Sequence, residues 1–350
     1  MQQHRDIARS LCRDWPRHDP SFSEEQLRVG SLVLRVRSSQ PRFLPMLHEL
    51  IRTRPLGSVR RSDSHTLFLT LVEDPQTLDA LAAGYESGLQ RADSAGPAGQ
   101  AVTEIRHDIS RSIVCDTDAQ RTDVLVLLGS AGQSEERILS AIMIAVYRIL
   151  YHLGRVLIHA AAIGMSGGTN VLLGDKGSGK TTTSMYLGRR GFPILAEDHV
   201  LLCQRPDGYT VSGCDDCIRL TRETELLFFE NGLDLPITDI GGVAKKELDP
   251  TTREEILWRP FEDAPVRRLF LPRVGDEFKV ERLASLPAVL GLVASVQKRF
   301  RFVDRDDRQR FLDYFSDFVE PLEVYRLTLS RDLDQLHRLA DWFEEHQERG

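Results

Sequence analysis

The sequence predicts an α/β protein of two domains, the second organised around a glycine-rich loop. Apolar runs of strand length alternate along the chain with segments whose apolar residues recur at helical spacing. The stretch at 174–181, Gly-Asp-Lys-Gly-Ser-Gly-Lys-Thr, lies between one such strand and one such helix. The chain has 350 residues, which is enough for two separate cores. We therefore expect a smaller α/β domain at residues 1–130 and a larger one at 131–350.

In the first domain, strands and short helices are expected to alternate. Residues 31–37 (SLVLRVR) alternate apolar and polar side chains, which indicates a half-buried strand. The same patterns predict a helix at 41–51, a strand at 65–72, a helix at 78–89, a loop at 92–100, a hairpin at 102–115 and a strand at 123–128. No set of reactive side chains stands out in this half, so we expect an accessory domain that docks a substrate or forms a dimer.

The second domain is expected to begin with a long helix at 134–153, whose apolar residues fall on one face. Strands at 156–163 and 170–173 lead to the glycine-rich loop, and a helix at 182–190 leaves it. The later elements are a strand at 191–198, a hairpin at 200–204 and 209–212, a helix at 221–231, strands at 266–271 and 278–283, helical structure at 286–319, a strand at 325–329 and a helix at 332–346. Lys245 and Lys246 are expected in a loop.

Composition excludes several classes of protein. The formal net charge of −7, with no basic tract, argues against a general nucleic-acid binder and leaves room only for a local basic cleft. The first residues lack an apolar core, so we expect no secretory signal, and the apolar stretch at 138–150 is too short for a membrane span. The odd count of 5 cysteines in a long chain favours reduced thiols in the cytoplasm. Cys214 and Cys217 form a lone Cys-x-x-Cys, for which zinc binding, redox chemistry and a structural role all stay open.

The loop matches G-x-x-x-x-G-K-[ST], the phosphate-binding loop of nucleotide-binding proteins. Glycines let successive backbone N–H groups turn toward an anion, and the helix that follows adds its positive end. Lys180 reaches the β- and γ-phosphates in such a loop, and Thr181 offers its hydroxyl to Mg²⁺. The expected cofactors are ATP and Mg²⁺. The residues expected to bind them are Gly174, Asp175, Lys176, Gly177, Ser178, Gly179, Lys180, Thr181 and Thr182.

Further candidates for chemistry flank the loop in sequence. His159 lies on the strand before it, and Glu197 and Asp198 close the strand after its helix. One carboxylate at such a position holds Mg²⁺ and the other accepts a proton from an acceptor hydroxyl. We assign the metal to Glu197 with Thr181, and the base to Asp198. Lys246, or its neighbour Lys245, is the candidate cation for charge in the transition state.

These stretches together resemble the core of the HPr kinase/phosphorylase family, a P-loop group related to the phosphoenolpyruvate carboxykinases. The resemblance rests on His159 with three alanines, the loop at 174–181, and Arg-Gly-x-x-x-Leu-Ala-Glu-Asp at 190–198, where the family has Ala-Asp-Asp. It covers residues 150–345 approximately. It implies an ATP-dependent kinase acting on a hydroxyl, usually of serine, in a protein, a ribosomal peptide or a small metabolite. It also implies that Asp198 is the catalytic acid/base, that His159 assists it beside the phosphates, and that the protein is a homo-oligomer.

The resemblance has limits. Residues 212–219 (SGCDDCIR) do not reproduce the glycine-rich signature that follows the acidic pair in HPr kinases proper, so neither reverse phosphorolysis nor HPr as acceptor is implied. Asp215, Asp216 and Arg219 in this stretch either lie near the acceptor or are ordinary loop charges. Two other functions stay open: an ATP-binding regulatory or scaffold protein that transfers nothing, and a carboxykinase-like enzyme acting on a carboxylate, for which the sequence lacks a second metal site.

Overall fold

The computed structural model describes residues 23–38, 44–45, 64–72, 102–107, 110–118, 121–129, 146–147, 150–151, 154–239, 243–260, 262–297, 305–330 and 335–346. The chain divides into two compact units, residues 1–153 and 154–350, and each is described by itself. The boundary expected after residue 130 falls outside the described residues. So do the helix expected at 78–89, the loop at 92–100 and most of the helices expected at 41–51 and 134–153.

The first unit contains a six-stranded mixed sheet with the order β1-β2-β3-β6-β5-β4. Its strands are β1 (Ser23–Val29), β2 (Leu32–Ser38), β3 (Ser64–Val72), β4 (Val102–His107), β5 (Ser110–Asp118) and β6 (Arg121–Gly129). β3 pairs in parallel with β2 and β6, while the other neighbours are antiparallel. The strands and the hairpin expected here are confirmed, but β1 was not predicted because its sequence, SEEQLRV, is mostly polar.

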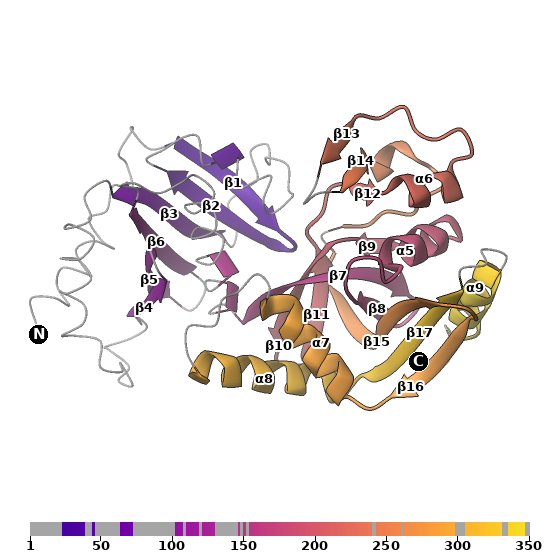
Figure 1. Cartoon of the computed structure of the whole chain (residues 1–350). Helices are drawn as coiled ribbons and strands as arrows, with labels where there is room; N and C mark the ends of the chain where they lie inside the picture. Colours follow the sequence, from indigo (N-terminus) through magenta and orange to yellow (C-terminus); the bar gives the residue numbers. More distant parts are fainter. Residues whose placement is uncertain are drawn as a thin grey trace, which may run out of the picture. The chain divides into compact units, whose positions relative to one another are not determined.

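The second unit is built on an eight-stranded mixed sheet whose main path is β11-β10-β7-β8-β15-β17-β16, with β9 paired to β7 (Figure 1). The strands are β7 (Arg155–Met165), β8 (Gly168–Leu173), β9 (Ile194–Ala196), β10 (His199–Arg205), β11 (Gly208–Gly213), β15 (Ala264–Gly275), β16 (Lys279–Leu283) and β17 (Glu323–Ser330). β11 also pairs with β15, so five of these strands close into a ring. β8, β15 and β17 run parallel, which brings their carboxyl ends to one edge of the sheet. Ligands of open α/β sheets bind at such an edge.

A separate three-stranded sheet, with the order β12-β14-β13, follows β11 in the chain. Its strands are β12 (Ile218–Leu220), β13 (Ile237–Asp239) and β14 (Ala244–Leu248), and α6 (Arg222–Phe228) lies between β12 and β13 in sequence. The prediction of a loop around Lys245 and Lys246 is wrong, because both residues are in β14 and pair with β13. The sequence of β14, AKKEL, is short and mostly charged, so it lacks the alternation of apolar and polar residues that predicts a strand.

Helices cover the large sheet. The remaining elements are α5 (Lys180–Arg189), the 3-10 helix η1 (Pro250–Thr252), α7 (Leu286–Gln297), α8 (Arg305–Val319) and α9 (Leu336–Glu345). The helical structure expected at 286–319 is confirmed as the helices α7 and α8, and the strand expected at 191–198 is reduced to β9. α5 packs against β7 and β9, and α7 packs against β7, β8 and α8 (Figure 1). In the described part of the chain, no helix is long and apolar enough to cross a membrane.

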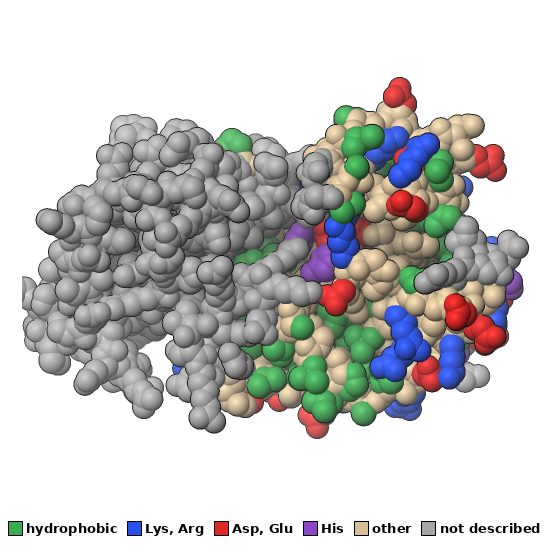
Figure 2. Space-filling model, in the orientation of Figure 1, with side chains coloured by type: hydrophobic (Ala, Val, Ile, Leu, Met, Phe, Trp, Pro, Cys, Tyr) green, Lys and Arg blue, Asp and Glu red, His purple; other side chains and the backbone are tan. Residues whose placement is uncertain are grey.

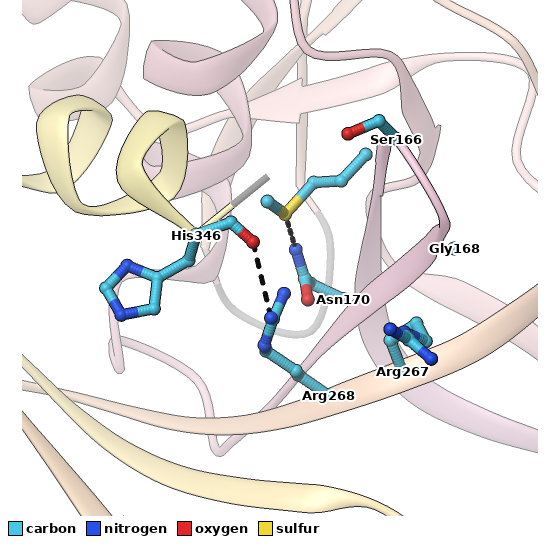
Figure 3. Close-up of a pocket in the computed structure, with 7 residues that line it drawn as sticks. Ser166, Gly168, Asn170, Arg267, Arg268 and His346 are labelled. Carbon is cyan, nitrogen blue, oxygen red and sulfur yellow. Dashed lines mark hydrogen bonds between the residues drawn. The ribbon is translucent and has the colours of Figure 1, made fainter. Parts of the chain in front are cut away.

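The core of the second unit lies between the large sheet and helices α5 and α9. Phe270 is fully buried and stacks on Phe343 of α9, with ring centroids 5.3 Å apart. Figure 3 shows how β15 is tied to the end of the same helix: Arg268 of β15 donates from Nη2 to the carbonyl oxygen of His346 at 3.3 Å, beside Asn170 of β8. Arg268 also donates from Nε to Glu323 of β17 at 2.9 Å. These bonds join β15 to α9 and to β17.

Candidate active site

The glycine-rich loop joins the carboxyl end of β8 to the amino end of α5. Gly179 is the residue before the helix and has φ +96°, and a Cβ there would lie 2.3 Å from Leu329 Cδ1. Only glycine fits that position. No side chain caps α5, so its first N–H groups face the loop, which is the arrangement that binds an anion. The helix begins two residues before the predicted start, at Lys180.

Lys180 is buried and its ammonium group lies inside the loop. Nζ donates to the carbonyl oxygens of Gly174 at 2.6 Å and of Asp175 at 3.2 Å. The backbone N–H of Ser178 donates to the same Asp175 carbonyl at 3.2 Å, which closes the loop on itself. The side-chain Oγ of Ser178 is buried and has no hydrogen-bond partner in the protein. The loop therefore presents a buried cation and an unused hydroxyl together.

Thr181 and Glu197 lie together behind the loop. The Thr181 hydroxyl donates a hydrogen bond to the Glu197 carboxylate, which is only 4% exposed. Burial raises the pKa of Glu197 from its ordinary 4.5 to about 7, and the charge of Asp215 adds to the rise, while Thr181, Lys245 and Lys180 act against it. The Oε1 atom of Glu197 is buried without a hydrogen-bond partner. An unsatisfied buried carboxylate oxygen beside a threonine hydroxyl is suited to a cation.

His159 and Asp198 form a second contact of the site. Nδ1 of His159 lies 2.5 Å from Oδ1 of Asp198 and 3.1 Å from its backbone carbonyl oxygen. The backbone N–H of His159 donates to Oγ of Ser295 on α7 at 3.1 Å, so a helix fixes this point of β7. Asp198 itself is buried, with 7% of its surface exposed. The position of His159 is thus fixed by the pairing of β7 with β10 and by the hydrogen bond to α7.

A cleft of about 740 Å³ connects His159 with the loop. Its walls are the first five loop residues (174–178), the carboxyl end of β15 including Arg273, and one face of α7 including Ser295. That volume is in the usual range for a ligand pocket. Nε of Arg273 donates to Oγ1 of Thr328 at 3.0 Å, which holds this guanidinium at the cleft wall formed by β15. Sequence reasoning did not find Arg273, because nothing local distinguishes it from the other arginines.

Exposed apolar side chains lie on α7, next in sequence to Pro287 and Gly291, which line the cleft. Leu286 and Leu290 lie one helical turn apart and are 64% and 54% exposed, and Figure 2 shows hydrophobic side chains on the visible face over this helix. Val274, at 45% exposure, lies on the cleft wall formed by β15.

Lys246 is not among the side chains gathered at the loop. Its Nζ lies 2.8 Å from Oε1 of Glu225 on α6 and also donates to the carbonyl oxygen of Leu233. Burial acts to raise the pKa of Glu225, but hydrogen bonds from Lys246, Leu233 N–H and Arg222 outweigh it, so this pKa is about 2. These contacts favour a structural role for Lys246 beside α6, and its catalytic assignment stays a prediction. Its neighbour Lys245, together with Lys180, acts to lower the pKa of Glu197.

Asp215 is the buried carboxylate that the sequence left undecided. Its Oδ2 accepts the backbone N–H groups of Glu197 at 3.4 Å, Asp198 at 2.9 Å and His199 at 2.7 Å. Its Oδ1 lies 2.9 Å from Nδ1 of His199, and both side chains are 2% exposed. Asp215 therefore does not face solvent. It contacts the backbone of the turn that carries Glu197 and Asp198, which we call the acidic turn. No local signal in the sequence reveals a bond between residues 16 to 18 positions apart.

The cysteines on either side of Asp215 give no sign of metal or redox chemistry. Cys214 is buried and its backbone N–H donates to the His199 carbonyl at 3.0 Å. Burial, and then the charge of Glu247, raises the pKa of the Cys217 thiol to about 12, which disfavours the reactive thiolate. Within the described ranges, no three His, Cys, Asp or Glu side chains gather to hold a metal ion.

The donor set fits a triphosphate with Mg²⁺ better than a protein-only metal cage. Mg²⁺ usually takes one or two carboxylates and completes its shell with phosphate oxygens and water. Glu197, with an unused Oε1, and Thr181 are the protein ligands available for this at the loop. Lys180, the uncapped N–H groups of α5 and the unused Ser178 hydroxyl are the groups available for phosphate.

Comparisons with known proteins add little to this geometry. No protein-family model matches the chain, and no curated protein matches its sequence. Among solved structures, the chain is similar to the HPr(Ser) kinase/phosphatase from Coxiella burnetii, with 11% identity, 54% of this chain and 98% of that chain covered, and a TM-score of 0.26. A likeness of that size carries no argument about fold or activity, so both rest on the residues described above.

Proposed function

We propose that this protein is an ATP- and Mg²⁺-dependent kinase that transfers the γ-phosphate to a hydroxyl group, usually of serine, in a protein, a peptide or a small metabolite. The observation that carries the proposal is the contact of 2.5 Å between His159 and Asp198, on a cleft that the phosphate-binding loop also lines. A protein that only bound a nucleotide would need the loop but not this pair.

Each residue has a role that follows from its contacts. Bound ATP supplies the transferable phosphoryl group, and Mg²⁺ neutralises charge as the phosphate moves. Lys180 and the N–H groups of the loop and α5 hold the phosphates. Thr181 and Glu197 hold the cation. Phosphoryl transfer depends mostly on such positioning and on electrostatic stabilisation.

Asp198 accepts the proton of the acceptor hydroxyl. His159 orients the Asp198 carboxylate through Nδ1, and Ser295 fixes the backbone of His159. Lys245, which acts on the charge of Glu197, replaces Lys246 as the lysine of the site. Arg273 neutralises negative charge from the cleft wall formed by β15. Proton transfer to a placed base contributes roughly 10²- to 10⁴-fold in rate.

The test is an acceptor screen with γ-labelled ATP and Mg²⁺. The full-length protein is incubated with serine-containing peptides, folded proteins and small alcohols, and products are identified by the phosphate mass shift. Transfer that is abolished by Asp198→Asn and retained by Asp234→Asn, which changes an exposed carboxylate, supports the proposal. ATP binding by calorimetry without transfer to any acceptor would instead favour a regulatory or scaffold protein.

A further inference from the structure

The acidic turn that carries Glu197 and Asp198 is not fixed by hydrogen bonds between paired strands. β9 stops at Ala196 and β10 begins at His199, so Glu197 and Asp198 fall between two strands. Both side chains nevertheless have to be fixed, because one contacts Thr181 and the other contacts His159. A misplacement of about 1 Å costs about a hundredfold in rate at such sites.

The N–H groups of this turn converge on a single atom. Three successive donors, from residues 197, 198 and 199, all point to Oδ2 of Asp215. Successive backbone N–H groups that converge in this way form an anion-binding nest, and the anion is a side chain of the same protein. Asp215 is 1% exposed, so these bonds are shielded from water.

The other oxygen of Asp215 is fixed as well. Oδ1 lies 2.9 Å from Nδ1 of His199, and His199 is 1% exposed. His199 lies directly opposite His159 in the pairing of β10 with β7. The half-buried His159 and the buried His199, each paired with an aspartate, are thus neighbours across β7 and β10, and the carboxylate of Asp215 also binds the backbone N–H of Asp198.

The segment that delivers Asp215 approaches the turn closely. A Cβ on Gly213 would lie 1.7 Å from the carbonyl oxygen of Leu195 and 3.2 Å from Cβ of Ala196. No residue larger than glycine fits there, because the obstacle is backbone. Gly213 thus lets the end of β11 pack onto the end of β9, two residues before Asp215 enters the nest.

From these contacts we infer that Asp215 is the positioning residue of the site: through the backbone of residues 197–199 it sets Glu197 for the cation and Asp198 for the acceptor hydroxyl. The inference rests on the proposed function for what the two carboxylates do. Asp215 acts through the turn and touches neither phosphate nor acceptor. Its hydrogen-bond geometry, rather than its charge, is what the site requires.

Two substitutions separate geometry from charge. Asp215→Asn removes the charge, but its amide oxygen can take the three N–H groups and its NH₂ can face His199 Nδ1 in the neutral ring. Asp215→Glu keeps the charge, but its extra methylene displaces the carboxylate from the nest. Asp207→Glu, in the exposed turn between β10 and β11, is the matched control for an added methylene.

Amide hydrogen exchange by NMR and steady-state transfer kinetics are measured on each full-length variant. We expect Asp215→Asn to keep protection at residues 197–199 and a kcat within about tenfold of the wild type. We expect Asp215→Glu to lose protection at these residues at least tenfold, and to lose about a hundredfold in kcat. Its KM for ATP at saturating Mg²⁺ should stay within about threefold, because the loop is untouched.

Two results would overturn the inference. One is an Asp215→Glu variant with normal protection and normal kcat. The other is an Asp215→Asn variant that keeps protection yet loses transfer, which would assign the role to charge. If the wild type transfers phosphate to no acceptor, the proposed function fails, and the exchange data alone still decide whether Asp215 holds the turn.

Discussion

His159 Nδ1 lies 2.5 Å from Asp198 Oδ1. The positions of both residues depend on the pairing of β7, which carries His159, with β9, which Asp198 follows. Asp198→Asn should lower kcat by about a hundredfold or more, because the proton acceptor is lost. His159→Ala should have a smaller effect, about tenfold, because it acts through Asp198. Residues that act as a unit are not additive, so the double variant should be no slower than Asp198→Asn alone. Additive losses in kcat would show that the two residues act independently.

Lys180→Ala should abolish tight nucleotide binding. The lysine is the buried cation of the loop, and each hydrogen bond to a charged group is worth about 1.5 to 3 kcal/mol. Two such bonds to phosphate correspond to a loss of at least about a hundredfold in affinity. Calorimetric titration with Mg·ATP measures it. Lys176→Ala, in the same loop and on the cleft wall, is the control for loss of a positive charge and should weaken binding much less. Equal losses in the two variants would remove Lys180 from its role.

Glu197→Gln should stabilise the protein in the absence of nucleotide and divalent cations. The unfolded chain ionises near pH 4.5, whereas burial keeps Glu197 protonated in the folded protein up to about pH 7. Wild-type stability is therefore unaffected by this group below pH 4.5, falls between these values and stays lower above pH 7. At about 1.4 kcal/mol per pH unit the full difference is about 3 kcal/mol.

Urea unfolding of both proteins at pH 4.5 and pH 8, with a chelator present, checks this prediction. The variant should match the wild type at the lower pH and exceed it by up to about 3 kcal/mol at the higher pH. A difference independent of pH would mean that Glu197 is not held in its neutral form. The same variant should bind Mg·ATP less tightly, since Gln lacks the charge that a cation requires.

Lys246→Met and Lys245→Met should have opposite consequences. The first leaves Glu225, whose side chain is 1% exposed, without its lysine, and breaking a buried pair costs about 3 to 5 kcal/mol. Its effect should appear in unfolding midpoints, with transfer by the remaining folded protein little changed. Lys245→Met should cost less than about 1 kcal/mol in stability but lower kcat. Loss of kcat in folded Lys246→Met would restore the original assignment of that lysine.

Much of the second unit follows from local patterns in the sequence. The loop at 174–181 is recognisable because phosphate binding demands glycines at fixed offsets, and the apolar run Val-Leu-Leu before it predicts a buried strand. The hairpin of β10 and β11 was predicted from its Pro-Asp-Gly turn and its alternation. The positions of His159 in β7 and of Asp198 just after β9 were likewise predicted from short segments.

The rest depends on contacts between distant segments, which single-sequence patterns do not encode. The pairing of β11 with β15 joins residues more than 50 positions apart. The bonds of Asp215 to the acidic turn exist only once β11 lies on β9. Arg273 lines the cleft because β15 is parallel to β8, and that order is set by the whole sheet. The strands β1 and β14 were not predicted because their sequences are mostly polar. Each is a strand because it pairs with a neighbouring strand.

Lys245 and Lys246 are adjacent in β14, and successive side chains of a strand point to opposite faces. One lysine therefore serves the packing of α6 while the other serves the charge of Glu197. The two lysines differ in the face of the strand to which they point, not in their chemistry. An insertion before Ala244 that shifted the strand by one residue would bring Lys245 to the place of Lys246 and Ala244 to the place of Lys245, so the positive charge that Lys245 places beside Glu197 would be lost without any change in the residues of the strand.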